Sequence, residues 1–221
     1  MTVGFIGSGH IGTVVARLSV TAGYHVIMSN SRGPQTLTDL ADELGPLAEA
    51  ATGEQAAARG DLVVVTIPLR AYRSVPVAPL AGKVVIDTCN YYPQRDGRFA
   101  ELDRGSLTSS ELVQQHLPGA RVVKAFNNIF YRHLLALSRP AGAADRSFLP
   151  IAGDSADAKA QASAFLDAIG YGAVDAGPLA ESWRQEPGTP VYGAPYGPFS
   201  DPVGTPADET TVRAALAKAT R

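Results

Sequence analysis

The sequence predicts an α/β fold in which helices cover both faces of a doubly wound, mostly parallel sheet. Three observations lead to this prediction. Short apolar runs alternate with segments of helical periodicity, and a glycine-rich turn joins the first run to the first helix. The chain of 221 residues is long enough to bury a core. With 45% hydrophobic and 18% charged residues, its composition is typical of a compact globular protein.

The first half of the chain predicts strands and helices in regular alternation. Ile11, Val14, Leu18 and Ala22 recur at helical spacing after the glycine-rich turn, and Gly23 ends that helix. Further helices start where Pro34 suits a first turn and where Thr52 suits an N-cap. We therefore expect strands over 3–6, 24–28, 47–50, 62–67 and 83–87, and helices over 11–22, 34–44 and 52–59.

The second half continues the alternation of strands and helices, and its amino-acid composition then changes. We expect helices over 109–117, 155–169 and 207–219, and strands over 121–125, 148–152 and 172–175. Pro150 lies inside one of these strands, which favours an edge position because proline donates no ladder hydrogen bond. The segment 177–206 holds 5 glycines and 7 prolines with interspersed aromatic residues. We expect a dinucleotide-binding domain over 1–140, then a sheet extension and a C-terminal arm over 141–221.

The turn at 7–12 has the spacing of a dinucleotide-binding loop. Gly7 permits a tight turn out of the strand, Gly9 lets the backbone approach a pyrophosphate, and Gly12 lets the helix pack closely on the strand. The helix N-terminus offers unpaired N–H groups and a partial positive charge to the anion. The strand before the turn and the helix and strand after it make this loop typical of a Rossmann-type fold.

The end of the second predicted strand indicates which dinucleotide binds. An NAD site usually places Asp or Glu there for the ribose 2′-hydroxyl, but residues 29–33 read Ser-Asn-Ser-Arg-Gly. Ser31 can donate a hydrogen bond to a 2′-phosphate, and Arg32 can pair with it as a bidentate cation. These residues predict NADP(H), unless Arg32 is simply a solvated turn residue.

Composition also excludes several kinds of partner and site. The 19 basic and 21 acidic residues form no basic run, so we expect no nucleic-acid partner. No apolar stretch is long enough to span a membrane, and the N-terminus lacks the pattern of a signal peptide, so we expect a cytoplasmic protein with no membrane partner. The single cysteine, Cys89, excludes an internal disulfide and a multi-cysteine metal site, and we expect no metal.

Five segments together resemble the NADPH:coenzyme F420 oxidoreductase family. They are GSGHIG at 7–12, SNSRG at 29–33, TIP at 66–68, DTCNYY at 87–92 and VKAFNN at 123–128. The resemblance runs over about the first 175 residues. It implies an oxidoreductase that transfers hydride between NADP(H) and an 8-hydroxy-5-deazaflavin, coenzyme F420, as a second redox substrate. The arm at 177–206 has no match to a deazaflavin pocket.

The resemblance and the loop pattern together give a set of candidate cofactor-binding residues. The glycine loop would hold the pyrophosphate, the residues after the second strand the 2′-phosphate, and residues at later strand ends the ribose and nicotinamide. No catalytic acid or base is required, because the two redox rings carry the chemistry. The candidates are Gly7, Ser8, Gly9, His10, Ile11, Gly12, Ser29, Asn30, Ser31, Arg32, Ile67, Pro68, Leu69, Asn90 and Asn127.

Several of these positions allow a second interpretation. His10 could touch phosphate or substrate, or lie exposed without a role. Asn90 and Asn127 could face the redox rings, or could serve turn chemistry. Cys89 is better explained as a small buried residue than as a reactive thiol. The aromatic residues of the arm could cover the second ring or pack on another subunit, and we expect a homodimer.

Two other functions share the cofactor features. One is an NADPH-dependent reductase of another small acceptor, such as a carbonyl, an imine, a flavin or a ferric chelate. The other is a non-catalytic NADP(H)-binding sensor. Oxidation of NADPH by the correct acceptor would distinguish either enzyme from the sensor.

Overall fold

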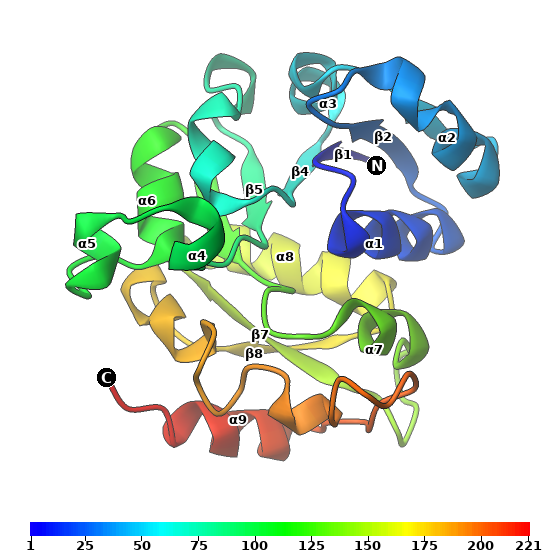
Figure 1. Ribbon diagram of the computed structural model, residues 1–221. Coiled ribbons are helices and arrows are strands. Elements are labelled where there is room, and N and C mark those ends of the chain that lie inside the picture. The colour runs from blue at the N-terminus through cyan, green and yellow to red at the C-terminus, as the bar shows by residue number, and fades with distance from the viewer.

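A single mostly parallel sheet runs through the molecule. The computed structural model describes all 221 residues and places eight strands in the order β3-β2-β1-β4-β5-β6-β7-β8 (Figure 1). All neighbouring strands are parallel except β6 and β7, which are antiparallel. The strands are β1 (Thr2–Ile6), β2 (His25–Ser29), β3 (Ala48–Ala50), β4 (Leu62–Val65), β5 (Val84–Asp87), β6 (Arg121–Lys124), β7 (Phe148–Gly153) and β8 (Gly172–Asp175).

Nine α-helices and several 3₁₀ turns connect the strands. The helices are α1 (His10–Thr21), α2 (Thr38–Leu44), α3 (Gly53–Arg59), α4 (Pro93–Asp96), α5 (Ala100–Asp103), α6 (Ser109–His116), α7 (Tyr131–Ala136), α8 (Ala156–Ala168) and α9 (Glu209–Ala217). The short helices α4, α5 and α7 were not expected from the sequence. The predicted cap of α3 is confirmed, because the Thr52 side chain accepts a hydrogen bond from the Gln55 N–H group.

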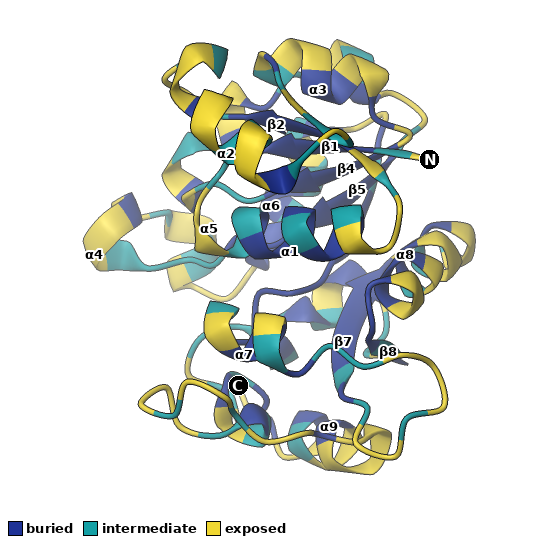
Figure 2. Cartoon of the chain, turned by 90° about the vertical axis from the view of Figure 1, so that its right-hand side faces the viewer, coloured by how far each residue is buried: buried dark blue, intermediate teal, exposed yellow.

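The sheet is buried on both faces, as a parallel sheet requires. Alternate residues of each central strand point to opposite faces. Val64 of β4 belongs to the core that includes residues of α1 and α8, whereas Val63 and Val65 belong to the core that includes α6. Figure 2 shows buried strands between helices whose outer surfaces are exposed. The predicted α/β fold with a doubly wound, mostly parallel sheet is confirmed.

The strand order places a ligand crevice next to β1. From β1 the chain proceeds to β2 and β3 on one side and then crosses to β4 and β5 on the other. In sheets of this kind, ligands bind outside the carboxyl ends of the strands where the order reverses. The loops that follow β1 and β4 therefore border the expected site.

The edge position predicted from Pro150 is wrong, because β7 lies between β6 and β8. The proline is tolerated because β6 pairs only with Ala152 and Gly153, so Pro150 lies beyond the end of that pairing. Pro150 is aligned with Val174 of β8, but its own carbonyl accepts a hydrogen bond from the Gln185 side chain. The backbone groups of this residue thus point to the side away from β8, where no ladder donor is needed.

The segment 177–206 packs against the second half of the sheet. It contains two 3₁₀ turns, Leu179–Gln185 and Ala194–Tyr196, and leads into α9. Leu179, Val191 and Tyr196 are at most 1% exposed, so the segment contributes to the core. We call this segment the arm.

None of the helices is long and apolar enough to cross a membrane.

Candidate functional site

The glycine loop is held tightly against the loop that follows β4. Gly7 has φ of +108°, and a Cβ at this position would lie 2.4 Å from the Thr66 carbonyl oxygen. A Cβ on Gly12 would lie 2.5 Å from Thr66 Oγ1, which itself donates a hydrogen bond to the Gly7 carbonyl at 2.9 Å. Gly12 is buried, and it determines how closely α1 approaches the strand ends. Gly7 therefore makes the tight turn, and Gly12 the close packing of helix on strand, that were predicted for them.

Gly9 faces open space in front of the α1 N-terminus. A Cβ at Gly9 would meet no atom of the chain within 4 Å. Gly9 is also the N-cap of α1 and supplies no side-chain acceptor to the first turn, whereas Thr108, Ser155 and Asp208 cap the other helices of eight or more residues. The first N–H groups of α1 are therefore free to bind an anion that approaches the loop.

In the turn after β2, two polar side chains are hydrogen-bonded within the chain and two are not. Ser29 is buried and donates to the Phe5 carbonyl, and the Asn30 carboxamide oxygen accepts from the Arg32 N–H group at 2.9 Å. Asn30 also donates to Thr36 Oγ1 at 3.0 Å. Ser31 and Arg32 are exposed, and their side chains make no hydrogen bond within the chain. They can therefore serve an external phosphate, while Ser29 and Asn30 shape the turn.

These elements enclose a cavity of about 560 Å³, which we call the dinucleotide cavity. Arg32 is its one cation and Glu54 its one acid. Most of the residues proposed for the pyrophosphate and the 2′-phosphate come together here. The cavity is lined by Ile6, Gly7, Ser8, Gly9, Ser29, Asn30, Ser31, Arg32, Gly53, Glu54, Thr66, Ile67, Pro68, Ala71, Ser74 and Pro76.

A second cavity of about 490 Å³ continues from the first, and we call it the acceptor cavity. The two cavities share Gly9, Thr66, Ile67 and Pro68. Its walls are aromatic, and the arm supplies Tyr192 and Phe199 to them. It is lined by Gly9, His10, Ile11, Thr66, Ile67, Pro68, Thr88, Asn90, Tyr92, Arg95, Asn127, Asn128, Ile129, Phe130, Tyr131, Tyr192 and Phe199.

Leu69 requires a correction, because it lines neither cavity. It was expected beside the nicotinamide, next to Pro68. Leu69 is fully buried in the core shared with α6, at the start of the 3₁₀ turn Leu69–Ser74. The chain turns inward after Pro68, so the next side chain packs into the core instead of facing the cleft.

Two tyrosine hydroxyl groups meet in the wall of the acceptor cavity. The hydroxyl of Tyr192, from the arm, is hydrogen-bonded to the hydroxyl of Tyr92. The Arg95 guanidinium lies 4.9 Å from the centre of the Tyr92 ring and donates to the Asp96 carboxylate and the Asn90 carbonyl. Burial, and then the Tyr92 hydroxyl, raise the pKa of Tyr192, so the Tyr192 hydroxyl is protonated at neutral pH. It can supply one O–H donor to a ligand.

Asn90 and Asn127 are joined to each other and to the arm. Asn127 donates to the Asn90 side chain at 3.0 Å and to the Gln185 carbonyl at 2.6 Å, and its oxygen accepts from Gln185 Nε2 at 2.9 Å. Asn127 is only 4% exposed. Just before it, Phe126 has φ of 61°, the one left-handed conformation outside glycine. Asn127 therefore anchors the arm, while the less buried Asn90 lies at the cavity surface.

A buried charge network supports the strand ends beneath the cavity. Lys124 is fully buried, and its Nζ donates to the Cys89 carbonyl at 2.7 Å, to Ser109 Oγ at 2.9 Å and to Ser110 Oγ at 3.1 Å. Asp87 Oδ2 lies 3.6 Å from Nζ and accepts from Ser110 at 2.6 Å. The network thus fixes the backbone that leads to Asn90.

The Cys89 thiol is part of the packing. It is 2% exposed, and burial, followed by the Asp87 carboxylate, raises its pKa well above the ordinary value. A protonated, enclosed thiol is a poor nucleophile. This geometry supports the structural interpretation of Cys89.

His10 packs against an aromatic residue of α7. Its ring stacks on that of Tyr131 with centroids 4.3 Å apart and planes 13° apart. The pair borders the acceptor cavity beside Gly9. Tyr131, Arg95 and Phe130 were not singled out from the sequence, and Tyr92 was named only as part of the DTCNYY segment. The only sequence feature that could have pointed to Tyr131 is its position after the end of a predicted strand.

Comparisons with known proteins identify relatives of the chain. A family model described as NADP oxidoreductase coenzyme F420-dependent matches residues 2–91. The F420-dependent NADP reductase of Methanothermobacter thermautotrophicus is 30% identical over 200 residues, which cover 84% of each chain. The metalloreductase STEAP3 of Rattus norvegicus is also 30% identical, over 83% of this chain, but the match covers 35% of that protein. The chain thus spans about a third of the length of that relative.

Solved structures share the fold. The hypothetical protein SMa0349 of Sinorhizobium meliloti superposes with a TM-score of 0.75 at 31% identity, covering 86% of this chain and 92% of the other. A candidate F420-dependent NADP reductase of Arthrobacter sp. FB24 gives a TM-score of 0.68 at 23% identity, covering 82% and 87% of the two chains. The second similarity, at this identity, concerns the fold alone.

Proposed function

The chain belongs to the coenzyme F420-dependent NADP oxidoreductase family, and from this premise we propose that it transfers hydride between NADPH and a deazaflavin of the coenzyme F420 type or a similar flavin-like ring. Members of the family are NADP-dependent oxidoreductases. The observation that carries the proposal is the continuity of the dinucleotide cavity with an aromatic cavity through Gly9, Ile67 and Pro68.

The residues of the dinucleotide cavity fit NADP(H). The space in front of Gly9 and the uncapped N-terminus of α1 suit a pyrophosphate, and Arg32 and Ser31 have free donors for a 2′-phosphate. When bound, the reduced nicotinamide supplies the hydride. Pro68 and Ile67, which border both cavities, would hold the nicotinamide and the acceptor ring against each other.

The residues of the acceptor cavity would bind and orient a flat ring. Tyr92, Phe130, Tyr192 and Phe199 offer aromatic surface for stacking, and the Tyr92–Tyr192 hydroxyl pair offers a donor at one edge. The arm excludes water from this side of the cleft. Stacking two rings in contact while excluding water is what a hydride transfer requires of the protein.

The test is a spectroscopic assay that follows both chromophores. Purified protein is mixed with NADPH and the oxidised deazaflavin, and we expect NADPH and deazaflavin absorbance to fall together with one-to-one stoichiometry. Parallel mixtures contain flavin mononucleotide (FMN) or a ferric chelate in place of the deazaflavin. The Tyr192→Phe variant, which keeps the ring and removes the arm hydroxyl, should raise the acceptor KM while the NADPH KM is unchanged.

A second candidate is an NADPH-dependent reductase of flavins or ferric chelates. The similarity to the metalloreductase STEAP3, which extends over 83% of this chain, favours it. Turnover with FMN or the chelate, and none with the deazaflavin, would select this candidate. NADPH binding without oxidation by any acceptor would instead favour a sensor and contradict both enzyme proposals.

A further inference from the structure

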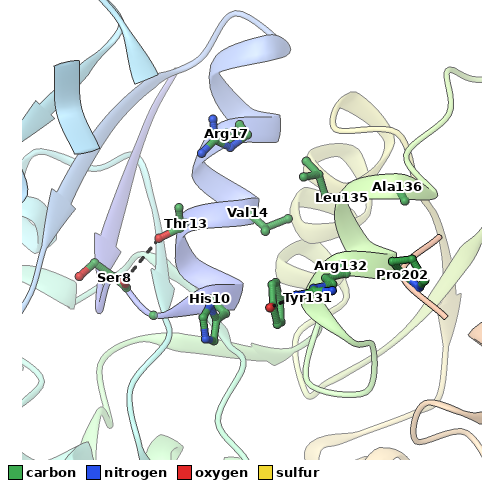
Figure 3. Close-up of a pocket in the computed structure, with 11 residues that line it drawn as sticks. Ser8, His10, Thr13, Val14, Arg17, Tyr131, Arg132, Leu135, Ala136 and Pro202 are labelled. Carbon is green, nitrogen blue, oxygen red and sulfur yellow. Dashed lines mark hydrogen bonds between the residues drawn. The ribbon is translucent and has the colours of Figure 1, made fainter. Parts of the chain in front are cut away.

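A third cavity lies between α1 and α7, and the function proposed above assigns no role to it. Figure 3 shows the two helices side by side, with Val14 of α1 and Leu135 of α7 pointing toward one another across the gap. We call it the α1–α7 groove, and its volume is about 640 Å³. It is lined by Ser8, Gly9, His10, Thr13, Val14, Arg17, Tyr131, Arg132, Leu135, Ala136 and Pro202.

The groove is positively charged. Its lining includes Arg17 and Arg132 and contains no Asp or Glu. Arg17 donates to Glu43, which lies outside the groove, so part of its charge is neutralised there. Arg132 donates through Nε to the Tyr131 hydroxyl at 3.2 Å, and its other guanidinium N–H groups have no partner in the chain. A ligand group that suits these donors is an anion such as a phosphate or a carboxylate.

Part of the groove lining is apolar. Val14, Leu135, Ala136 and Pro202 form this part, and Leu135 is 45% exposed. An apolar stretch beside a free guanidinium suits an extended group that carries carbon atoms along its length and an anion at its end. A bare inorganic ion would leave the apolar part uncovered.

The groove adjoins the acceptor cavity. Gly9, His10 and Tyr131 line both, and the stacked His10 and Tyr131 rings form the boundary between them. A ring held in the acceptor cavity would therefore have its substituent within reach of the groove. We infer that the α1–α7 groove binds a flexible, anionic substituent of the acceptor, and that Arg132 determines the specificity of the groove for this substituent. This inference rests on the proposed function.

Riboflavin and FMN test this inference, because they share one ring and one ribityl chain and differ in a terminal phosphate. Their dissociation constants are measured by quenching of flavin fluorescence, with NADP⁺ at saturation so that the dinucleotide cavity is filled. We expect FMN to bind about tenfold more tightly than riboflavin, as a charge-assisted hydrogen bond predicts. Arg132→Gln should reduce this preference to about one, and Arg17→Gln should reduce it less, because Arg17 also pairs with Glu43.

Arg104→Gln is the matched control, since Arg104 is exposed, lies outside the groove and makes no side-chain hydrogen bond. It should keep the full preference for FMN, and all variants should keep the wild-type unfolding midpoint. Equal affinity for the two flavins, no binding of either, or a preference that survives Arg132→Gln would overturn the inference. Because the readout is binding, flavin binding without hydride transfer would contradict the proposed function and leave the groove assignment standing.

Discussion

Under the proposed function, Arg32 is the residue that selects NADP(H) over NAD(H). Its guanidinium is exposed at the dinucleotide cavity and has no partner in the chain, so its binding energy is available to a ligand. We predict that Arg32→Ala weakens NADPH binding by about 1.5–3 kcal/mol, roughly ten- to a hundredfold, and hardly affects NADH. Calorimetric titration of both nucleotides measures this. Equal losses for the two would show that Arg32 has no role at the 2′-phosphate.

Gly9 offers a separate test of the pyrophosphate position. Its φ of −74° suits alanine, and a Cβ there would meet only open space, so Gly9→Ala should leave the unfolding midpoint unchanged. The added methyl group would occupy the space proposed for the pyrophosphate, and we expect at least a tenfold loss of NADPH affinity. Gly7→Ala is the contrasting variant, because its Cβ would clash with the Thr66 carbonyl and should destabilise the fold itself. Unchanged NADPH affinity in Gly9→Ala would place the pyrophosphate elsewhere.

At the scale of elements, Lys124 holds β5, β6 and α6 together. Lys124→Met would leave the Asp87 carboxylate buried without its cation, and we predict a loss of about 3–5 kcal/mol in the free energy of unfolding. Urea denaturation measures the change. Lys218→Met, at an exposed lysine whose side chain makes no hydrogen bond, should stay within about 0.5 kcal/mol of wild type. The double variant Asp87→Asn, Lys124→Met should recover part of the loss, because no charge is then left unpaired.

The same elements show why sequence patterns predicted the sheet better than its surroundings. Apolar runs such as 62–65 have no alternative to burial, so the strands and their order of appearance were predictable. Lys124 was not, because nothing local distinguishes a lysine at a strand end from a solvated one. Pro150 was misjudged for a related reason, since the extent of pairing with β6 is a tertiary property.

Part of the candidate site was also predictable from the sequence, and part of it was not. Gly7, Gly9 and Gly12 follow a spacing that backbone geometry imposes, so the shape of the glycine loop was predictable. The acceptor cavity depends on Tyr92 meeting Tyr192, two residues far apart in the chain, and on an arm whose path no periodicity describes. Asn127 was identified correctly as a residue at a strand end, but its partner Gln185 could be found only in the folded chain.

At the scale of the whole molecule, the homodimer expected from the sequence remains a prediction. Phe199 and Val203 of the arm are 54% and 59% exposed, and apolar side chains of this kind often mark an interface. We predict that the wild-type chain sediments as a dimer and that Val203→Glu shifts it toward monomer. Val77→Glu, at another exposed apolar residue, should not. A wild-type monomer at micromolar concentration would contradict the prediction.

The side of β7 that faces the arm also bears on how the protein behaves at high concentration. There the Phe148 carbonyl accepts from the Tyr196 hydroxyl, the Pro150 carbonyl accepts from Gln185, and the Phe148 N–H group donates to the Ala207 carbonyl. Pro150 itself has no N–H group to offer. An unprotected strand edge is a template for intermolecular pairing and aggregation. Over residues 148–150, which β6 does not reach, groups outside any strand fill the hydrogen-bonding positions, and they prevent this part of β7 from recruiting a strand of another molecule.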